Sequence, residues 1–205
     1  MGWWTDHAVP RLADRALDVD RIHELRARVC DGLAGDVVEI GFGSGLNARH
    51  YPAAVDRVAA VEPSDVAWRM ARRNIARTRA PVERAGLDGQ ALDLGTASCD
   101  GALSTFTMCT IPDLDAALRE TVRVLRPGGV LHFVEHGLAP DPGVARWQHR
   151  LQPIQGRVAG GCHLDRPIRA YVERSGLVLE QLDTFYGMGP KPFGYLYLGR
   201  AVKRA

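Results

Sequence analysis

Short apolar runs rich in β-branched residues alternate along this chain with longer stretches in which apolar residues return every three or four positions. The short runs are typical of strands buried in a parallel sheet, and the periodic stretches are typical of amphipathic helices. Seven segments fit the strand pattern: residues 37–40, 57–61, 81–85, 100–106, 130–136, 177–180 and 193–201. The alternation predicts an α/β fold built on a doubly wound, mostly parallel sheet.

Four of the predicted helices bear on the function. Apolar residues at three- and four-residue intervals predict a helix over residues 12–29, before the first strand. Asp113 is expected to cap the helix that follows the fourth strand. Asp141, followed by a proline, predicts the start of a helix with four inward apolar side chains: Val144, Trp147, Leu151 and Ile154. Asp165 is expected to cap a last helix near the C-terminus.

A glycine-rich loop follows the first predicted strand. Glu39 precedes three alternate glycines, so the segment has the pattern E-x-G-x-G-x-G: Glu39, Gly41, Gly43 and Gly45. Glycines let a backbone turn sharply and approach a bulky ligand, and the residues that follow can begin a helix, whose positive end favours anions. The spacing differs from the G-x-G-x-x-G of dinucleotide-binding loops. A ligand-binding loop is the hypothesis, and an ordinary tight turn or a nucleotide-binding loop is the alternative.

An acidic residue ends the second predicted strand at a distance that suits a nucleoside ligand. Glu62 lies 21 residues after Gly41. A carboxylate at about this offset can accept hydrogen bonds from both ribose hydroxyls of a nucleoside held on a glycine loop. Acids are common at strand ends, so the offset from the loop carries the argument. Glu62 favours a nucleoside cofactor without identifying it.

The motifs along residues 36–136 resemble those of the class I S-adenosylmethionine (SAM)-dependent methyltransferases of small molecules. The glycine loop is similar to motif I of that family. Residues 87–92 resemble its G-D-A-x-x-L segment, with a leucine in first place, and residues 118–129 resemble its most recognisable later segment. The resemblance implies SAM as cofactor and S-adenosylhomocysteine as product. It also implies a seven-stranded sheet that closes in an antiparallel C-terminal hairpin, within a single domain of residues 1–205.

The resemblance further implies which residues hold the cofactor. Glu39 and the glycine loop would hold the methionine end, and Glu62 would hold the ribose. Asp88 would accept a hydrogen bond from the adenine amino group, and the backbone N–H of Gly89 would meet the ring. The implied set lies at the ends of the predicted strands: Glu39, Gly41, Gly43, Gly45, Glu62, Pro63, Asp88, Gly89, Ser104 and Phe106.

One branch of the family is more similar than the rest. Four segments resemble the thiol S-methyltransferase-like branch: Cys109-Thr110, Glu135-His136-Gly137, 160–164 and 194–197. That branch is implied to methylate small apolar thiols. The apolar N-terminal membrane segment of its animal members is not in this sequence, and no apolar run approaches 18 residues. A cytoplasmic protein without a membrane span is expected, and a peripheral membrane contact stays open as an alternative.

Methyl transfer from a sulfonium is an in-line displacement, so the enzyme mainly orients the acceptor and excludes water. Open α/β sheets bind ligands at the carboxyl ends of their strands, which makes His136 a candidate catalytic residue, together with His163. A hydrogen-bonded structural role for His136 is the alternative. The segment 1–35 is expected to form a helical lid, and 141–176 a helical insertion on the substrate side. Four residues are candidates for the acceptor pocket: Trp3, Trp4, Cys109 and Trp147.

Composition narrows the class of partner. The 205 residues are 46% hydrophobic and 24% charged, which is typical of one soluble globular domain. A net charge of +2 gives no electrostatic case for nucleic-acid binding, so a small-molecule acceptor is expected. The four cysteines are far apart and include no C-x-x-C pair. Neither a metal site nor a disulfide framework is therefore expected.

Other functions fit parts of this pattern. The acceptor could be an oxygen, nitrogen or carbon atom of a phenol, quinone or heterocycle in place of a thiol. A nicotinamide oxidoreductase would share the ribose-binding acid, and a SAM-binding protein without turnover would share the whole cofactor site. The sequence identifies neither the acceptor atom nor the oligomeric state, and it does not decide whether a general base is used.

Overall fold

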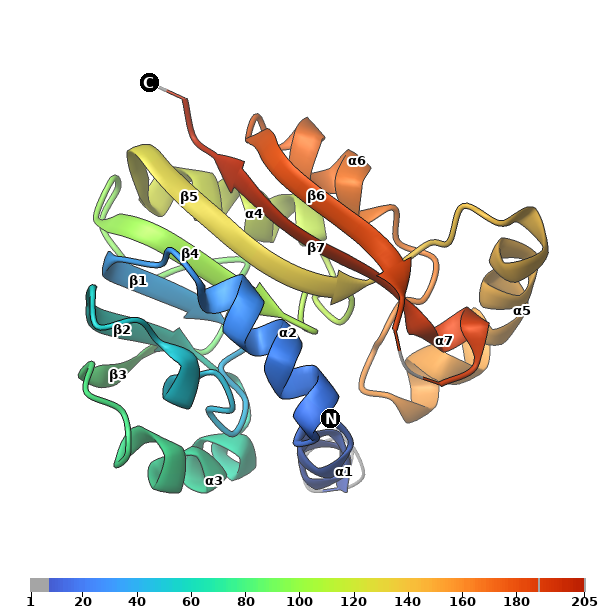
Figure 1. Cartoon of the computed structure of the whole chain (residues 1–205), viewed down its shortest axis with the longest axis horizontal. Helices are drawn as coiled ribbons and strands as arrows, with labels where there is room; N and C mark the ends of the chain where they lie inside the picture. The colour runs from blue at the N-terminus through green and yellow to red at the C-terminus, as the bar shows by residue number, and fades with distance from the viewer. Residues whose placement is uncertain (1–7, 188, 205) are drawn as a thin grey trace.

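One seven-stranded sheet organises the computed structural model, which describes residues 8–187 and 189–204 (Figure 1). The strands lie in the order β3-β2-β1-β4-β5-β7-β6. Their bounds are β1 (Gly35–Ile40), β2 (Val55–Val61), β3 (Val82–Gly86), β4 (Cys99–Thr105), β5 (Leu125–His136), β6 (Val178–Tyr186) and β7 (Tyr195–Val202). β7 runs antiparallel to β5 and β6, and all other neighbours are parallel. The predicted mostly parallel sheet with an antiparallel C-terminal hairpin is confirmed.

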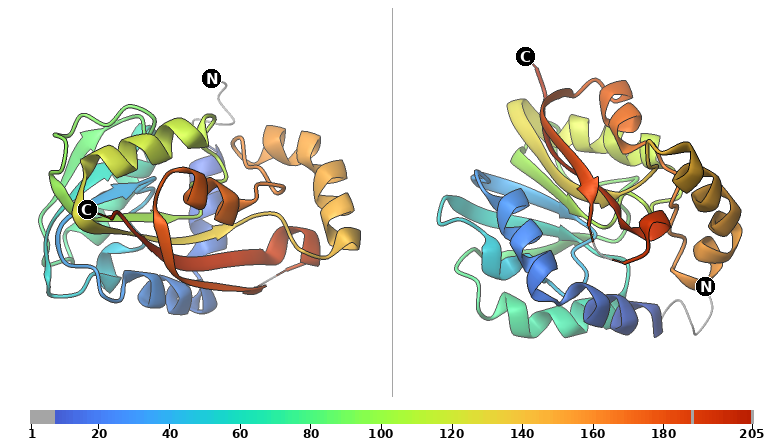
Figure 2. Two further views of the ribbon diagram at one scale, coloured as in Figure 1. Left: turned by 90° about the horizontal axis from the view of Figure 1, so that it is seen from above. Right: turned by 45° about the vertical axis from the view of Figure 1, so that its right-hand side comes forward.

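Helices cover both faces of this sheet (Figure 2). Their bounds are α1 (Val9–Leu17), α2 (Asp20–Cys30), the 3-10 helix η2 (Ala48–His50), α3 (Asp65–Ile75), α4 (Leu114–Val124), α5 (Pro142–Val158), α6 (Ile168–Arg174) and α7 (Lys191–Gly194). α4 and α6 bury Leu118 and Val172 against one face. α2 and α3 bury Val29 and Ala71 against the other. None of the helices in the described ranges is long and apolar enough to span a membrane.

The strand order places a crevice at the carboxyl ends of β1 and β4. Ile40 of β1 lies opposite Val61 of β2 on one side and Ser104 of β4 on the other. β1 is followed by β2 on one side of the sheet and β4 lies on the other, so the connections leave in opposite directions at this point. Open α/β sheets bind their ligands at such a point. The residues just after these strands therefore converge, although they are distant in sequence.

The predicted helix over residues 12–29 is two helices. Val19 has an extended backbone (φ −130°, ψ 148°) and separates α1 from α2. The carboxylate of Asp18 accepts a hydrogen bond from His23 (2.6 Å), which favours the break over a continuous helix. Leu12, on α1, is 51% exposed, whereas Ile22, Leu25 and Val29 of α2 are buried. Apolar residues recur at three- and four-residue intervals on both sides of Val19, so the sequence pattern did not reveal the break between the two helices.

The inward face predicted for α5 is right for Val144 and Leu151, which pack against buried clusters, and wrong for Trp147 and Ile154. Trp147 and Ile154 are 55% and 62% exposed, and Gln148 is buried instead. The Gln148 side chain accepts from the N–H of Ala139 (2.9 Å) and donates to the carbonyl oxygen of Gly137 (2.9 Å). Because buried backbone groups need partners, these bonds fix the rotation of the helix and turn a polar residue inward.

Of the three aspartates predicted to begin helices, Asp113 and Asp141 precede α4 and α5 as predicted, and Asp165 does not begin α6. The Asp113 side chain accepts from the N–H of Ala116 (2.9 Å) at the start of α4. α6 begins later than predicted, at Ile168, and Asp165 lies 3.0 Å from the Nδ1 atom of His149 on α5. The Asp165 carboxylate therefore pairs with a histidine of another helix and does not cap the start of α6.

Candidate active site

The glycine loop turns at the carboxyl end of β1 through three residues with left-handed φ. The φ angles are 76° at Gly41, 59° at Gly43 and 75° at Gly45. A Cβ atom at Gly41 would collide with the side chain of Thr107, so that glycine is required for close packing against the end of β4. A Cβ atom at Gly43 would meet no atom within 4 Å. Gly43 therefore faces open space, where a ligand can approach the backbone.

Glu62 follows β2 directly, and its carboxylate lies under the glycine loop. One carboxylate oxygen accepts from the N–H of Gly43 (2.7 Å), and the other accepts from the N–H of Ser64 (2.7 Å). Burial raises the pKa of Glu62, and the two N–H donors partly oppose that shift. Each oxygen keeps a lone pair for a further donor. The carboxylate is thus fixed beside the loop, in the position expected for a ribose-binding group.

Glu39 belongs to a buried polar network that the sequence did not suggest. Its carboxylate accepts from the side-chain amide of Asn47 (2.9 Å) and from the hydroxyl of Tyr51. Arg26, from α2, donates to Asn47 (2.7 Å) and to the hydroxyl of Thr105 (2.9 Å). Burial raises the pKa of Glu39 to about 7, although hydrogen bonds from Tyr51 and Asn47 oppose it. The network joins α2, β1, the glycine loop and β4 into one rigid unit.

The end of β4 is held by a buried carboxylate from β5. Oε1 of Glu135 accepts from the Ser104 hydroxyl (2.9 Å) and from the N–H groups of Thr107 (2.9 Å) and Met108 (3.0 Å). Burial raises the pKa of Glu135, which the N–H donors partly oppose. Phe106, between these donors, has a φ of 54°, an uncommon angle for a residue with a side chain. Strained backbone at the crevice is typical of a ligand-binding position.

The remaining predicted cofactor residues lie at the outer end of the crevice. Asp88 is exposed and accepts from the backbone and side-chain N–H groups of Gln90 (2.8 and 2.9 Å). A Cβ atom at Gly89 would approach the Ile40 side chain to 2.8 Å, so this segment packs on the last residue of β1. Pro63 is exposed beside Glu62. Asp88, Gly89 and Pro63 are thus all within the part of the fold expected to hold the nucleoside.

Two thiols and one imidazole meet beyond the ends of β4 and β5. The Cys162 sulfur lies 3.1 Å from the Nε2 atom of His136, and the ligand atoms of Cys109, His136 and Cys162 all lie within 4.8 Å of one another. We call these three residues the thiol–imidazole cluster. Leu164 and Leu151 pack around the two cysteines, which are buried. Spacing along the sequence concealed the cluster, since its members come from three separate segments.

The cluster separates charge. A hydrogen bond from Cys109 lowers the pKa of Cys162, with help from His136, although burial opposes the shift. The same bond, with burial, raises the pKa of Cys109. Burial lowers the pKa of His136, but the hydrogen bond and charge of Cys162 outweigh it, so the net shift is upward. These directions favour the thiolate form at Cys162 over Cys109 and the protonated form at His136.

His163 lies next to the cluster. Its backbone N–H donates to the carbonyl oxygen of Cys109 (2.8 Å), and its Nδ1 atom lies 3.1 Å from the side-chain amide of Gln152 on α5. Burial lowers the pKa of His163, with a further contribution from the charge of Arg166. Both candidate catalytic histidines are thus at the same edge of the sheet, with a neutral imidazole favoured at His163.

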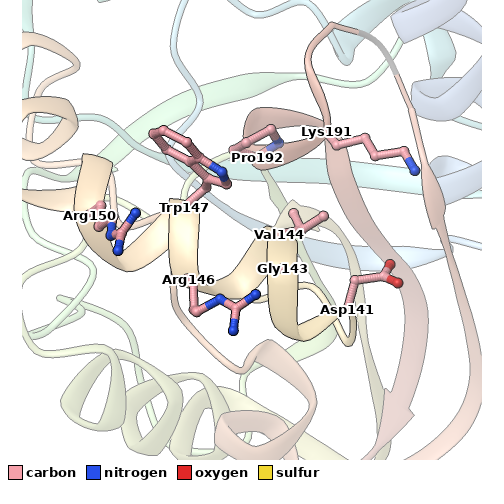
Figure 3. Close-up of a pocket in the computed structure, with 8 residues that line it drawn as sticks. All are labelled: Asp141, Gly143, Val144, Arg146, Trp147, Arg150, Lys191 and Pro192. Atoms are coloured by element: carbon pink, nitrogen blue, oxygen red, sulfur yellow. The ribbon is translucent and has the colours of Figure 1, made fainter.

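Trp147 lines a groove of about 800 Å³ between α5 and α7 (Figure 3). Val144 and Pro192 also line it, and three cations surround it: Arg146, Arg150 and Lys191. The Arg150 guanidinium lies 5.7 Å from the centre of the Trp147 ring. α5 lies beyond the carboxyl end of β5 (Figure 1). Trp3 and Trp4, also candidates for the acceptor pocket, lie outside the described residues.

α1 contacts both the glycine loop and the loop that leads to Cys162. The hydroxyl of Ser44, in the glycine loop, donates to the carboxylate of Asp14 on α1. A Cβ atom at Gly160, in the loop that leads to Cys162, would lie 3.1 Å from the Val9 side chain. The N-terminal helix therefore lies over the cofactor loop and reaches the segment that carries part of the cluster.

Comparison with known proteins assigns this geometry to a class. A family model described as Methyltransferase domain matches residues 38–133, which include the glycine loop and Glu62. A SAM-dependent methyltransferase structure from Mesorhizobium loti has a TM-score of 0.65, with 18% identity, and covers 90% of this chain and 98% of that one. One from Methanosarcina mazei has a TM-score of 0.62, with 18% identity and coverage of 82% and 92%. The chain is a class I SAM-dependent methyltransferase.

Its sequence relatives include named enzymes. Thiol S-methyltransferase TMT1B of Rattus norvegicus is 30% identical over 176 residues, which cover 82% of this chain and 70% of that protein. The Homo sapiens TMT1B is 31% identical over 185 residues, with coverage of 84% and 73%. The Homo sapiens TMT1A is 30% identical over 143 residues, with coverage of 68% and 58%. The similarity to these methyltransferases extends over more of the chain than the segment that the family model matches.

The residues present fit SAM as the methyl donor. Open space over Gly43 leaves room for the ligand at the loop, and the Glu62 carboxylate keeps free lone pairs there. Glu39 sits behind the loop as a buried acid, which suits a cationic amino group nearby. The enclosed, strained end of β4 at Phe106 completes the crevice. The chain therefore uses SAM and forms S-adenosylhomocysteine.

Proposed function

We propose that this enzyme transfers the methyl group of SAM to the sulfur atom of a small, apolar thiol. One observation carries the proposal: the relatives that span 82–84% of this chain at 30–31% identity are named thiol S-methyltransferases. Val144, Trp147 and Pro192 form the apolar part of the groove, and this part supports an apolar acceptor. We also propose that the enzyme works in the cytoplasm, as the sequence predicts.

The cofactor residues act by holding the donor in one orientation. In this proposal Glu62 accepts hydrogen bonds from the ribose, and Asp88 and Gly89 meet the adenine. The glycine loop, with Glu39 and its hydrogen-bond partners behind it, holds the methionine end. SAM supplies an activated methyl group with a good leaving group, so positioning is most of what the protein must provide. Ser104 and Phe106 line the crevice where β4 ends.

The acceptor residues orient the nucleophile and exclude water. A thiol has a pKa of about 8.5, so a fraction is ionised near neutral pH without a strong base. His136 and His163 need only orient the acceptor or help remove its proton. Trp147 contacts the apolar part of the acceptor. The N-terminal segment 1–35 and the insertion 141–176 cover this side, a role supported by the contacts of α1 with Ser44 and Gly160.

The experiment is a product assay on a matched panel. Purified enzyme is incubated with SAM and with alkyl thiols, aryl thiols, phenols and amines of equal carbon number, and the methylated products are quantified by mass spectrometry. We expect methyl thioethers from the apolar thiols, together with one S-adenosylhomocysteine per product. Methylation of phenols or amines with no methylation of any thiol would refute the proposal and favour an O- or N-methyltransferase.

A further inference from the structure

The thiol–imidazole cluster has the composition of a soft-metal site. It contains two sulfur atoms and one imidazole nitrogen within 4.8 Å of one another. Zn²⁺ bonds of about 2.3 Å to sulfur and about 2.0–2.1 Å to nitrogen place tetrahedral ligand atoms roughly 3.5–3.8 Å apart. In the cluster the Cys162–His136 separation is 3.1 Å, slightly shorter than these values, and no separation exceeds 4.8 Å. Thiolate and imidazole ligands together favour Zn²⁺ among common divalent ions.

Hydrogen bonding alone gives little reason to gather these groups. A cysteine sulfur is a weak acceptor and a weak donor, yet the Nε2 atom of His136 points at Cys162. The other ring nitrogen, Nδ1, is buried and has no hydrogen-bond partner among residues 8–187 and 189–204. An ion bound by Nε2 together with the two thiols would give this imidazole a stronger interaction than the sulfur contact.

The surroundings of Cys162 resemble those of a metal-bound thiolate. The side-chain amide of Gln155, on α5, donates to the Cys162 sulfur (3.8 Å), and the amide of Gln152 donates to its carbonyl oxygen (3.2 Å). Groups that hydrogen-bond to metal-binding residues in this way orient those residues and adjust the affinity of the site for its metal. On the other side, the N–H of His163 fixes the Cys109 backbone at 2.8 Å. The two cysteines are therefore held from α5 and by a backbone hydrogen bond between their loops.

We propose that Cys109, His136 and Cys162 bind one Zn²⁺ ion and leave its fourth position open on the acceptor side. Three protein ligands with an open position is the pattern of catalytic zinc sites, whereas structural sites have four. The three residues lie beyond β4 and β5, next to the Thr107 segment that packs on the glycine loop at Gly41. The open position then faces the region where the acceptor must meet the methyl group.

The role of the site rests on the proposed thiol methylation. The acceptor thiol releases its proton to solvent and occupies the open position as a thiolate. Its sulfur then forms a bond to the methyl carbon, while the carbon–sulfur bond of the sulfonium breaks and leaves its electron pair on S-adenosylhomocysteine. The resulting thioether is a neutral, weak ligand and departs. Binding the acceptor as a thiolate removes the need for a protein base.

The test measures metal directly, in the full-length protein. Protein purified without metal resin or chelator is dialysed, and its zinc is counted by plasma mass spectrometry; we expect one ion per chain. Replacement of zinc by Co²⁺ should produce the near-ultraviolet thiolate-to-cobalt band and the visible bands of a tetrahedral ion. No zinc at saturating supply, no cobalt spectrum, or a Cys109–Cys162 disulfide in freshly reduced protein would each overturn the site.

Variants localise the ion. Cys162→Ser and His136→Asn should each lower zinc affinity by more than about 100-fold, beyond what loss of an outer partner costs. Cys99→Ser is the matched control, since Cys99 is buried but outside the cluster, and it should keep wild-type affinity. Unchanged affinity in Cys162→Ser would overturn the assignment. If these variants do not fold, the wild-type cobalt spectrum decides by the presence or absence of its thiolate band.

The two proposals fail separately. Zinc bound at the cluster together with methylation of phenols alone would refute thiol transfer and leave the metal site standing. Thiol methylation at the full rate by zinc-free protein would uphold the proposed function and overturn the inferred role of the ion.

Discussion

The cofactor edge and the acceptor edge of this site are built in different ways. At the cofactor edge, a contiguous loop after β1 supplies backbone shape, and Glu62 fastens it through the N–H of Gly43. At the acceptor edge, Cys109, His136 and Cys162 come from three segments, and their side chains form the cluster. An edge formed by backbone shape suits a ligand that all members of a family bind. A side-chain-built edge can change its acceptor through few substitutions, and each change leaves the cofactor site intact.

Among substitutions at the cofactor edge, Gly43→Val is expected to weaken SAM binding most. The new side chain would enter the open space where the ligand approaches, so SAM binding should fall by more than about 100-fold, to the limit of calorimetry. Gly176→Val is the control, because Gly176 also has a positive φ (89°) and open space but lies at the end of α6, far along the fold. Equal SAM affinity in the two variants would contradict the mapping.

The buried acid of the cofactor edge should make stability depend on pH. Burial raises the pKa of Glu39 to about 7, so the folded state holds its proton longer than the unfolded state does. Its favourable contribution is complete below about pH 4.5 and is lost as pH rises through 7. At about 1.4 kcal/mol per pKa unit, the loss is roughly 3 kcal/mol. Saturating SAM, whose amino group is cationic, should reduce it.

Urea unfolding of the cofactor-free protein at several pH values measures this loss. Glu39→Gln should flatten the decline between pH 4.5 and 8 relative to wild type, whatever its effect at a single pH. Glu173→Gln is the control, since Glu173 is an exposed acid paired with Arg169, and its curve should follow wild type. Parallel curves for Glu39→Gln and wild type would contradict the prediction.

Loss of the ribose partner should be milder than obstruction of the loop. Glu62→Ala removes charge-assisted hydrogen bonds worth about 1.5–3 kcal/mol each, partly replaced by water, so SAM affinity should fall roughly ten- to hundredfold. The control is Asp36→Ala, an acid at the opposite end of β1 that pairs with Arg57. Calorimetry that gives wild-type affinity for Glu62→Ala would remove Glu62 from the cofactor site.

The smallest expected effect lies on the acceptor edge. Trp147 is half exposed, so an apolar acceptor can cover only part of its ring, and Trp147→Ala should raise KM for an apolar thiol roughly tenfold. The Kd for SAM should not change. Ile154→Ala provides the comparison, because Ile154 is equally exposed on α5 but lies outside the groove. Equal effects of the two substitutions on KM would exclude the groove as an acceptor site.

The same contrast explains what the sequence could predict. The succession of strands and helices along the chain, the glycine loop and the position of Glu62 depend on neighbouring residues and short offsets, so their patterns are visible in the sequence. The network of Arg26 with Asn47 and Thr105 joins α2 to β4 and has no local pattern. Such contacts depend on which strand ends become neighbours, and periodicity carries no information about that.

The errors on α5 have a comparable cause. Hydrophobic periodicity predicted that Trp147 would point inward, but the bonds of Gln148 to Gly137 and Ala139 set the rotation of the helix. Buried backbone groups of another segment decided the outcome, and a single-segment pattern cannot include them. The four cysteines were also judged by their spacing along the sequence, which predicted no metal site. Two of the four nevertheless lie together beside His136.

One consequence of α1 concerns the timing of turnover. None of its nine residues is buried, yet Asp14 bonds to Ser44 in the glycine loop and Val9 packs at Gly160. A helix with so little buried surface detaches at small free-energy cost, and one detachment uncovers both edges at once. We therefore expect the residence time of S-adenosylhomocysteine to be set by the opening of this helix and not by the chemical step.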